Sequence, residues 1–252
     1  MCSVYLLFIT GCTGPFATSD ESDSGNEVAV GSYSTMIVLA NKLYAVTDTK
    51  IFTFDISNTV KPQLMDSQDI GSNIESLFHY NGLLFVGSAN NMFIYTLDTS
   101  GIPRRESTSQ YHEVWGPDIC NSDPIVARSN IAYVTLSTTN SARCFAREIN
   151  ELRIYDISDI RNPALLSILE MSKPKGLGLG KKKLYICDEN LGLIIFDIKD
   201  PSKPVQEKIF DGYPAYDLIV KNDLLIVSSA RSLYQYDISD ENNIRLLSKI
   251  EL

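Results

Sequence analysis

The sequence predicts an all-β protein, a five-bladed β-propeller made of four-stranded repeats of about 41 residues. A motif of an apolar run, Asp-Ile, a polar turn and a proline recurs, as in "LRIYDISDIRNP" and "LIIFDIKDPSKP". No stretch holds apolar residues at a period of about 3.6 over three helical turns. Short strands repeated every 40 to 45 residues or so are typical of propeller blades.

The chain begins with a short apolar run that leads to a cysteine, in "MCSVYLLFITGC". This resembles the bacterial lipoprotein signal, which implies lipidation of Cys12. The run is far shorter than the roughly 20 apolar residues of a membrane-spanning helix, so it indicates an export signal in residues 1–12. No Lys or Arg precedes the run, which departs from the signal pattern. The alternative is a buried strand that ends in Gly-Cys.

The next segment, residues 13–31, is polar and acidic, as in "TGPFATSDESDSGNE". Such a composition buries little apolar surface and is typical of a flexible tether. We therefore expect the propeller to occupy residues 32–252. At 252 residues the chain is long enough for one all-β domain with a full core.

The charge balance is acidic. The chain has 22 Lys and Arg against 31 Asp and Glu, which gives a net charge of -9. Affinity for nucleic acid comes largely from clustered cations, so we expect no nucleic-acid partner.

Five registers of the motif align along the chain. The second strands read "KLYAVTD", "LLFVGSA", "IAYVTLS", "KLYICDE" and "LLIVSSA". The third strands end at equivalent positions, which are Asp55, Thr96, Asp156, Asp197 and Asp237. These positions are 41, 60, 41 and 40 residues apart, so repeat three carries a large insertion. An apolar run before each second strand and another after each third strand complete four strands per blade.

This pattern resembles the LVIVD-repeat family, which "LIIFDIKDPSKP" matches almost position for position. The resemblance extends over residues 32–252, although the second repeat has Thr96 in place of the aspartate. It implies an exported β-propeller, and it implies no reaction.

The recurring aspartate is predicted to be structural. An Asp that leaves a strand accepts hydrogen bonds from backbone N–H groups two residues on, and this closes the turn. The later proline then begins the outer strand, where a missing donor is tolerated. The alternative is a Ca²⁺ site, which needs several converging oxygens. We expect no metal and no cofactor.

Repeat three departs from the others in two insertions, "SQYHEVWGPDICNSDP" and "TTNSARCFAREIN". In a propeller, the connection into a blade and the loop between its second and third strands emerge on the same face. The two insertions should therefore meet, and each holds one cysteine, Cys120 and Cys144. A similar pair in exported members of the family that this chain resembles strengthens a Cys120–Cys144 disulfide. Cys187 lies within a strand and is expected to be a buried apolar residue.

The face that carries these insertions is the predicted ligand-binding surface, because arginine and aromatic side chains on long loops are typical of recognition. The candidate residues are Tyr111, His112, Trp115, Arg143, Arg147 and Tyr213. The alternative is that Trp115 and Phe145 pack the insertion onto its blade.

Two functions are consistent with this face. The favoured one is a non-enzymatic binding or scaffolding module of an outer-membrane lipoprotein, in the periplasm or on the cell surface, with a protein or glycan of the cell envelope as partner. The membrane would be contacted through the lipid anchor alone. The alternative is a hydrolase or lyase at the mouth of the central channel, with His112 or Asp118 as base and Arg143 holding a developing anion. "GLGLGKKK" lacks the phosphate-loop spacing and is expected to be a strand and a basic turn.

Overall fold

The computed structural model describes residues 34–111, 121–122, 124–138 and 149–252. Within them the chain forms five antiparallel sheets, and four strands of each follow one another in chain order.

Blade one holds β1 (Met36–Leu39), β2 (Lys42–Val46), β3 (Lys50–Asp55) and β4 (Gln63–Asp69). Blade two holds β5 (Ile74–Tyr80), β6 (Leu83–Ser88), β7 (Asn91–Leu97) and β8 (Pro103–Gln110). Blade three holds β10 (Ile125–Arg128), β11 (Ile131–Thr138), β12 (Asn150–Asp156) and β13 (Ala164–Glu170), and a short β9 (Asn121–Ser122) pairs with β11. Blade four holds β14 (Pro174–Leu179), β15 (Lys183–Asp188), β16 (Gly192–Asp197) and β17 (Val205–Phe210). Blade five holds β18 (Asp217–Lys221), β19 (Leu224–Ser228), β20 (Ser232–Asp237) and β21 (Arg245–Glu251).

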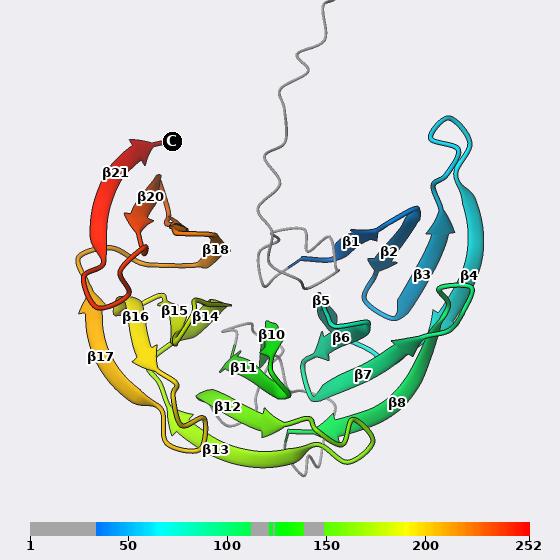
Figure 1. Cartoon of the computed structure of the whole chain (residues 1–252), viewed down its shortest axis with the longest axis horizontal. Helices are drawn as coiled ribbons and strands as arrows, with labels where there is room; N and C mark the ends of the chain where they lie inside the picture. Colours follow the sequence, from blue (N-terminus) through cyan, green and yellow to red (C-terminus); the bar gives the residue numbers. More distant parts are fainter. Residues whose placement is uncertain (1–33, 112–120, 123, 139–148) are drawn as a thin grey trace, which may run out of the picture.

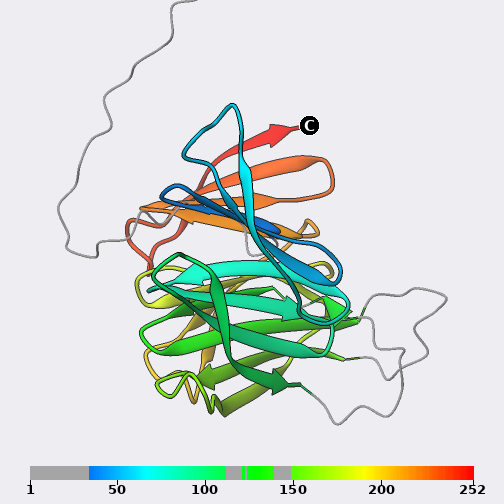
Figure 2. The same cartoon turned by 90° about the vertical axis from the view of Figure 1, so that its right-hand side faces the viewer.

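The sheets are arranged radially, with β1, β5, β10, β14 and β18 nearest the centre (Figure 1). Figure 2 turns blades one and two toward the viewer and shows that their strands run from one face of the disc to the other. The predicted five-bladed propeller is therefore confirmed, and every blade, including the last, has its own outer strand.

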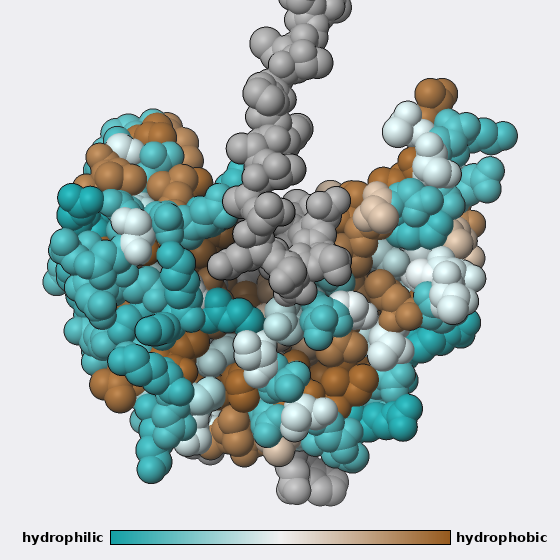
Figure 3. All heavy atoms as spheres, in the orientation of Figure 1, coloured by the Kyte–Doolittle hydropathy of each residue, from teal (hydrophilic) through white to brown (hydrophobic). Residues whose placement is uncertain are grey.

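The hydrophobic core of the described residues lies between the blades. Four clusters of buried side chains join blades one and two, two and three, three and four, and four and five. None of these clusters joins blade five to blade one, and Figure 1 shows the arc of sheets open between β21 and β1. In Figure 3 hydrophilic side chains cover much of the outer rim of this face, while hydrophobic atoms show between the blades.

The recurring aspartate does close the turn after the third strand. Its Oδ1 accepts the backbone N–H two residues on, at 2.8–2.9 Å, in four blades: Asp55, Asp156, Asp197 and Asp237. In blade two the Thr96 hydroxyl donates to Glu106 Oε1 at 2.9 Å, and Asp98, two residues later, accepts the N–H groups of Ser100 and Ile102. The same kind of turn is thus built two residues further along the chain.

Each fourth strand also has a β-bulge at an equivalent position, where one extra residue shifts its register with the third strand. The third-strand residue after the shift is aromatic in every blade: Phe54, Tyr95, Tyr155, Phe196 and Tyr236. In blades two to five this ring is at most 4% exposed and lies in the cluster shared with the preceding blade.

The glycines of "GLGLG" allow blades four and five to approach closely. A Cβ at Gly178 would lie 2.4 Å from a methyl carbon of Leu218, and a Cβ at Gly176 would lie 2.8 Å from the Cα of Asp217. Neither glycine needs a left-handed backbone, so the requirement at both positions is space.

Candidate functional site: the loop stem of blade three and an axial cavity

Two of the predicted ligand-binding residues, Tyr111 and Tyr213, lie among the described residues. Outside them lie His112, Trp115, Arg143, Arg147, Asp118, the cysteines Cys12, Cys120 and Cys144, and segments 1–12 and 13–31. Predictions for those residues stay predictions.

The described residues that flank the two insertions of blade three lie side by side. Ser122 pairs with Ser137, and Asn121 pairs with Thr138, through the short strand β9. Across the second insertion, the Thr138 hydroxyl donates to the carbonyl of Ile149 at 3.1 Å, and the N–H of Ile149 donates to the same hydroxyl at 2.6 Å. We call residues 121–122, 137–138 and 149–150 the loop stem. It brings the bases of both insertions to one end of β11.

A buried arginine supports the first insertion from below. Arg153, on β12, is 5% exposed, and its Nε donates to Glu151 Oε1 at 2.6 Å. Its Nη1 donates to the carbonyl of Tyr111 and, at 3.4 Å, to the hydroxyl of Tyr155. Burial opposes the charged form, yet the hydrogen bonds with Tyr155 and Glu151 give a net rise in the pKa of Arg153. The chain is therefore fixed where it leaves blade two for the insertion.

Arg153 was not predicted as a site residue, although its position in the repeat distinguishes it. The equivalent positions of the other third strands carry Phe52, Phe93, Ile194 and Tyr234, all apolar or aromatic. A charged residue at a strand position that is otherwise apolar indicates a buried ion pair with a specific task, because an unpaired buried charge is costly.

Tyr111 is built into the core rather than into an open surface. Its side chain is 4% exposed and packs in the cluster between blades two and three, with Arg153 lying 5.9 Å from its ring centre. Its ring therefore positions the insertion that begins at the next residue. A direct ligand contact by Tyr111 stays a prediction.

Tyr213 lies in the connection that enters blade five. Its ring stacks on Tyr234 at 3.9 Å between centres, and its hydroxyl shares a 2.6 Å hydrogen bond with that of Tyr236. Burial, followed by that hydrogen bond, raises the pKa of Tyr213. Blade four separates Tyr213 from the loop stem, so the two described candidates do not form one compact site.

Between them, blade four presents an ordered polar turn on the same face. Asp188 is fully buried and accepts the N–H groups of Lys173, Asn190 and Leu191. Glu189 then pairs with Lys173 at 3.0 Å and with Lys175 at 3.4 Å. Burial opposes ionisation of Glu189, but the hydrogen bonds and positive charges of Lys173 and Lys175 give a net lowering of its pKa.

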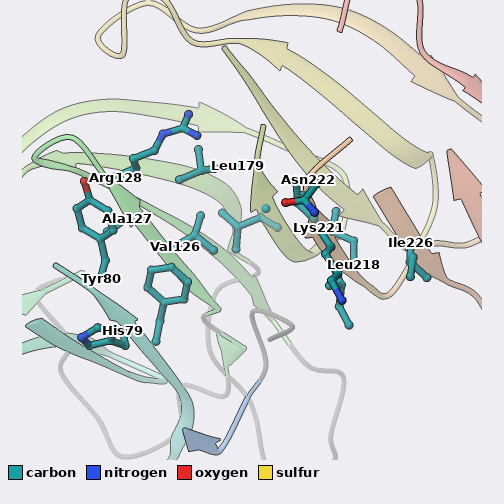
Figure 4. Close-up of a pocket in the computed structure, with 15 residues that line it drawn as sticks. His79, Tyr80, Val126, Ala127, Arg128, Leu179, Leu218, Lys221, Asn222 and Ile226 are labelled. Atoms are coloured by element: carbon teal, nitrogen blue, oxygen red, sulfur yellow. The ribbon is translucent and has the colours of Figure 1, made fainter. Parts of the chain in front are cut away.

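A cavity that the sequence did not indicate lies at the axis. It has a volume of about 790 Å³ and is lined by the innermost strands of blades two to five together with Ile226 of β19 (Figure 4). It lies at the end of β10 opposite the loop stem, because β10 starts beside the stem and reaches the cavity at Arg128. Loop face and cavity are thus two separate candidate sites.

Among the described residues, no group of three or more His, Cys, Asp or Glu side chains could hold a metal ion. No helix in that part of the chain is long and apolar enough to cross a membrane. Cys187 is free and fully buried, as expected, and burial raises the pKa of its thiol well above the usual value.

Radial four-stranded sheets, interblade cores and the repeated aspartate turn place the protein in the class of β-propellers. Within that class, residues 183–211 match the family model of the LVIVD repeat. The matched stretch includes "LIIFDIKDPSKP", so the repeat predicted by resemblance is confirmed there. Among curated proteins, none matches the chain significantly.

Solved structures show the same fold at low sequence identity. A protein from Lactobacillus plantarum superposes with a TM-score of 0.65 at 14% identity, over 86% of this chain and 70% of that one. The periplasmic gluconolactonase PpgL from Pseudomonas aeruginosa gives 0.59 at 12% identity, over 84% and 69%. BamB from Moraxella catarrhalis gives 0.57 at 11% identity, over 86% and 63%. These likenesses show the fold alone.

Proposed function

We propose that the protein is a cell-envelope lipoprotein that acts as a non-enzymatic binding module, with a protein or glycan as partner. The observation that carries the proposal is the loop stem, where β9 pairs with β11 and holds the bases of two long insertions together. A rigid scaffold that presents paired loops suits recognition, because little loop entropy is lost on binding. The insertions supply Trp115, Arg143 and Arg147, residue types that dominate binding energy at interfaces.

The test of this face is a binding experiment with envelope extract on the immobilised protein. A Trp115→Ala, Arg143→Ala double variant should lose the partners that the wild type retains. Arg161→Ala is the matched control, because Arg161 lies on the turn after β12 and pairs at 3.0 Å with Glu106. Identical partners for wild type and double variant would place recognition elsewhere.

Catalysis is the competing function of the same face. A periplasmic gluconolactonase shares the fold, so the architecture accommodates chemistry as well. If His112→Ala abolished turnover of an envelope polysaccharide or peptide while leaving partner binding intact, the enzyme function would replace the binding function.

The proposed disulfide between Cys120 and Cys144 would close the two insertions over the loop stem. It would stabilise mainly by restricting the unfolded chain, by roughly 3 kcal/mol for a loop of this size. Peptide mapping of the exported protein without reductant should find the linked pair. Free thiols at both positions would reject it.

The proposed anchor is a lipid on Cys12, which gives membrane affinity through buried methylene groups. Mass spectrometry of protein from its native cells should find an N-terminus that starts at a lipidated Cys12. Residence at the outer membrane, in the periplasm or on the cell surface, follows from that anchor. An uncleaved and unmodified N-terminus would contradict both.

A further inference from the structure

Most of the wall of the axial cavity is apolar, and its residues come from four different blades. Strand side chains supply most of this surface: Phe78, Val126, Ala127, Leu177, Leu179, Leu218, Ile219, Val220 and Ile226. Its volume of about 790 Å³ falls within the range of small-molecule sites, about 300–1,000 Å³. Such a surface favours an apolar ligand body.

The polar groups of the cavity lie where the innermost strands end, and the charged ones are cationic. Arg128 ends β10 and Lys221 ends β18, and Figure 4 shows them on opposite sides of the cavity. No Asp or Glu is among the 15 residues that line it, although the whole chain carries a net charge of -9. Asn222, Tyr80 and His79 are the other polar residues that line the cavity.

Neither cation is neutralised by a neighbouring carboxylate in the described residues. The ion pairs found there do not include Arg128 or Lys221, and the adjacent Asp223 pairs with Lys181 at 3.1 Å. Arg128 Nη2 donates to the carbonyl of Lys181 at 3.2 Å, which holds the guanidinium at the rim. A smaller hollow of about 260 Å³ continues from Arg128 and adds Lys182. The rim therefore has positive charge available for a ligand.

We propose that the axial cavity binds an amphipathic carboxylate, with the head group at the cationic rim that Arg128 and Lys221 flank and the hydrocarbon body against Phe78, Leu218 and Ile226. Charge-assisted hydrogen bonds from arginine and lysine hold a carboxylate strongly. A chain of methylene groups gains free energy from the apolar wall in proportion to the area that it buries. This site lies at the other end of the strands from the loop stem, so it stands whether or not the loop face binds a partner.

Isothermal titration calorimetry with dodecanoate tests the site on the whole protein. Dodecanoate should bind, whereas acetate, which has the head group alone, and dodecyltrimethylammonium, which has the opposite charge, should bind at least tenfold more weakly. An Arg128→Gln, Lys221→Gln double variant should lose about tenfold or more in affinity for dodecanoate, because tenfold corresponds to the loss of roughly one charge-assisted bond. Lys203→Gln, at an exposed turn of blade four, is the matched control and should keep wild-type affinity.

Several outcomes would overturn the proposal. They are no binding of dodecanoate, equal binding of the cationic amphiphile, and undiminished binding by a double variant whose unfolding midpoint equals that of the wild type. If the double variant fails to fold, Lys221→Gln alone decides, because Lys221 is exposed and makes no ion pair in the described residues. Ile226→Ser should lower the affinity for dodecanoate and leave the affinity for acetate unchanged. This result would distinguish the apolar wall from the site of the head group.

Discussion

At the scale of the residue, the repeated aspartate can both close a turn and form an ion pair. In blade four Asp197 accepts the N–H of Lys199 at 2.9 Å and also pairs with Lys183 at 3.0 Å. The backbone hydrogen bond comes first among the causes that hold its pKa well below the usual value, and the bond from Lys183 follows. The Lys183 side chain is 3% exposed, and Asp197 together with Glu207, which pairs with the lysine at 2.7 Å, stabilises a cation that burial would otherwise penalise. Asp197 thus closes a turn and also contributes to the stability of the buried Lys183.

A histidine at the axial cavity should make stability depend on pH. Burial lowers the pKa of His79 below its ordinary value of 6.5, and its Nδ1 is buried without a hydrogen bond in the described residues. Below about pH 6.5 the unfolded chain binds the proton more readily than the folded chain, so stability should fall as the pH drops from 7.5 to 5. His79→Phe should remove much of this fall and leave stability at pH 7.5 equal or slightly higher.

Thermal unfolding between pH 5 and 7.5 measures the effect. The carboxylates with lowered pKa stay ionised over that window, so they contribute little to the slope. His112→Gln, which removes the other histidine of the chain, is the control and should keep the wild-type slope. A His79→Phe variant with an unchanged slope would assign the pH dependence to other groups.

At the scale of the element, each joint between blades is made by an aromatic ring from the preceding blade. The third residue of the second strand is Tyr44, Phe85, Tyr133 or Tyr185 in blades one to four, and these rings are at most 3% exposed. The Tyr44 hydroxyl donates to the carbonyl of Gly101 at 2.8 Å, and that of Tyr185 donates to Glu241 at 3.2 Å. Both acceptors lie on the turn between the third and fourth strands of the following blade. Blade five has Ile226 at this position, half-buried at the axial cavity.

Because of this difference, we expect substitution by alanine to lower the free energy of unfolding more at Tyr185 than at the equivalent Ile226. Tyr185→Ala should destabilise by about 3–5 kcal/mol, because it empties a buried aromatic site between two blades. Tyr185→Phe should cost about 1 kcal/mol, which is the net loss of one hydrogen bond. Ile226→Ala should cost clearly less than Tyr185→Ala. Urea unfolding of the three variants measures the differences, and equal losses at both positions would show that the ring of Tyr185 has no special part in the joint.

Much of this architecture could be predicted because it repeats. The aspartate turns, the strand order and the five blades each leave a local pattern in "LIIFDIKDPSKP" and its copies. The β-bulges could not be predicted, because the aromatic residue beside each shift is also common in a regular strand and does not by itself specify a bulge. The axial cavity arises from how Phe78, Val126 and Leu218 of different blades lie around the centre, and no sequence spacing specifies that arrangement.

At the scale of the whole molecule, the arc of blades leaves one apolar sheet face uncovered by the described residues. In each innermost strand, the residue that pairs with the fourth residue of the second strand points toward the preceding blade. This position is buried in Leu77, Ile125, Leu177 and Leu218, with exposures of 0–3%, whereas Met36 of blade one is 60% exposed. Val38, on the same face, is 41% exposed, and Figure 1 shows β1 beside the opening. Blade one thus presents a surface of the kind that every other blade buries.

The exposure of that face predicts a large asymmetry between equivalent positions. Leu77→Ala should destabilise by about 2–5 kcal/mol, because its side chain fills the joint between blades one and two. Leu218→Ala, at the joint between blades four and five, should cost a similar amount. Met36→Ala should change stability by no more than about 0.5 kcal/mol, as expected for an exposed side chain.

Urea unfolding of the three alanine variants, each at two protein concentrations, decides whether the opening persists in solution. A cost for Met36→Ala as large as that for Leu77→Ala would contradict an open arc, since the methionine would then be covered. If that cost grew with protein concentration, the cover would be a second copy, because association stabilises by mass action. If it did not, the cover would come from the same chain, outside the described residues. A small cost at both concentrations leaves the face of blade one open to solvent, as the exposure of Met36 indicates.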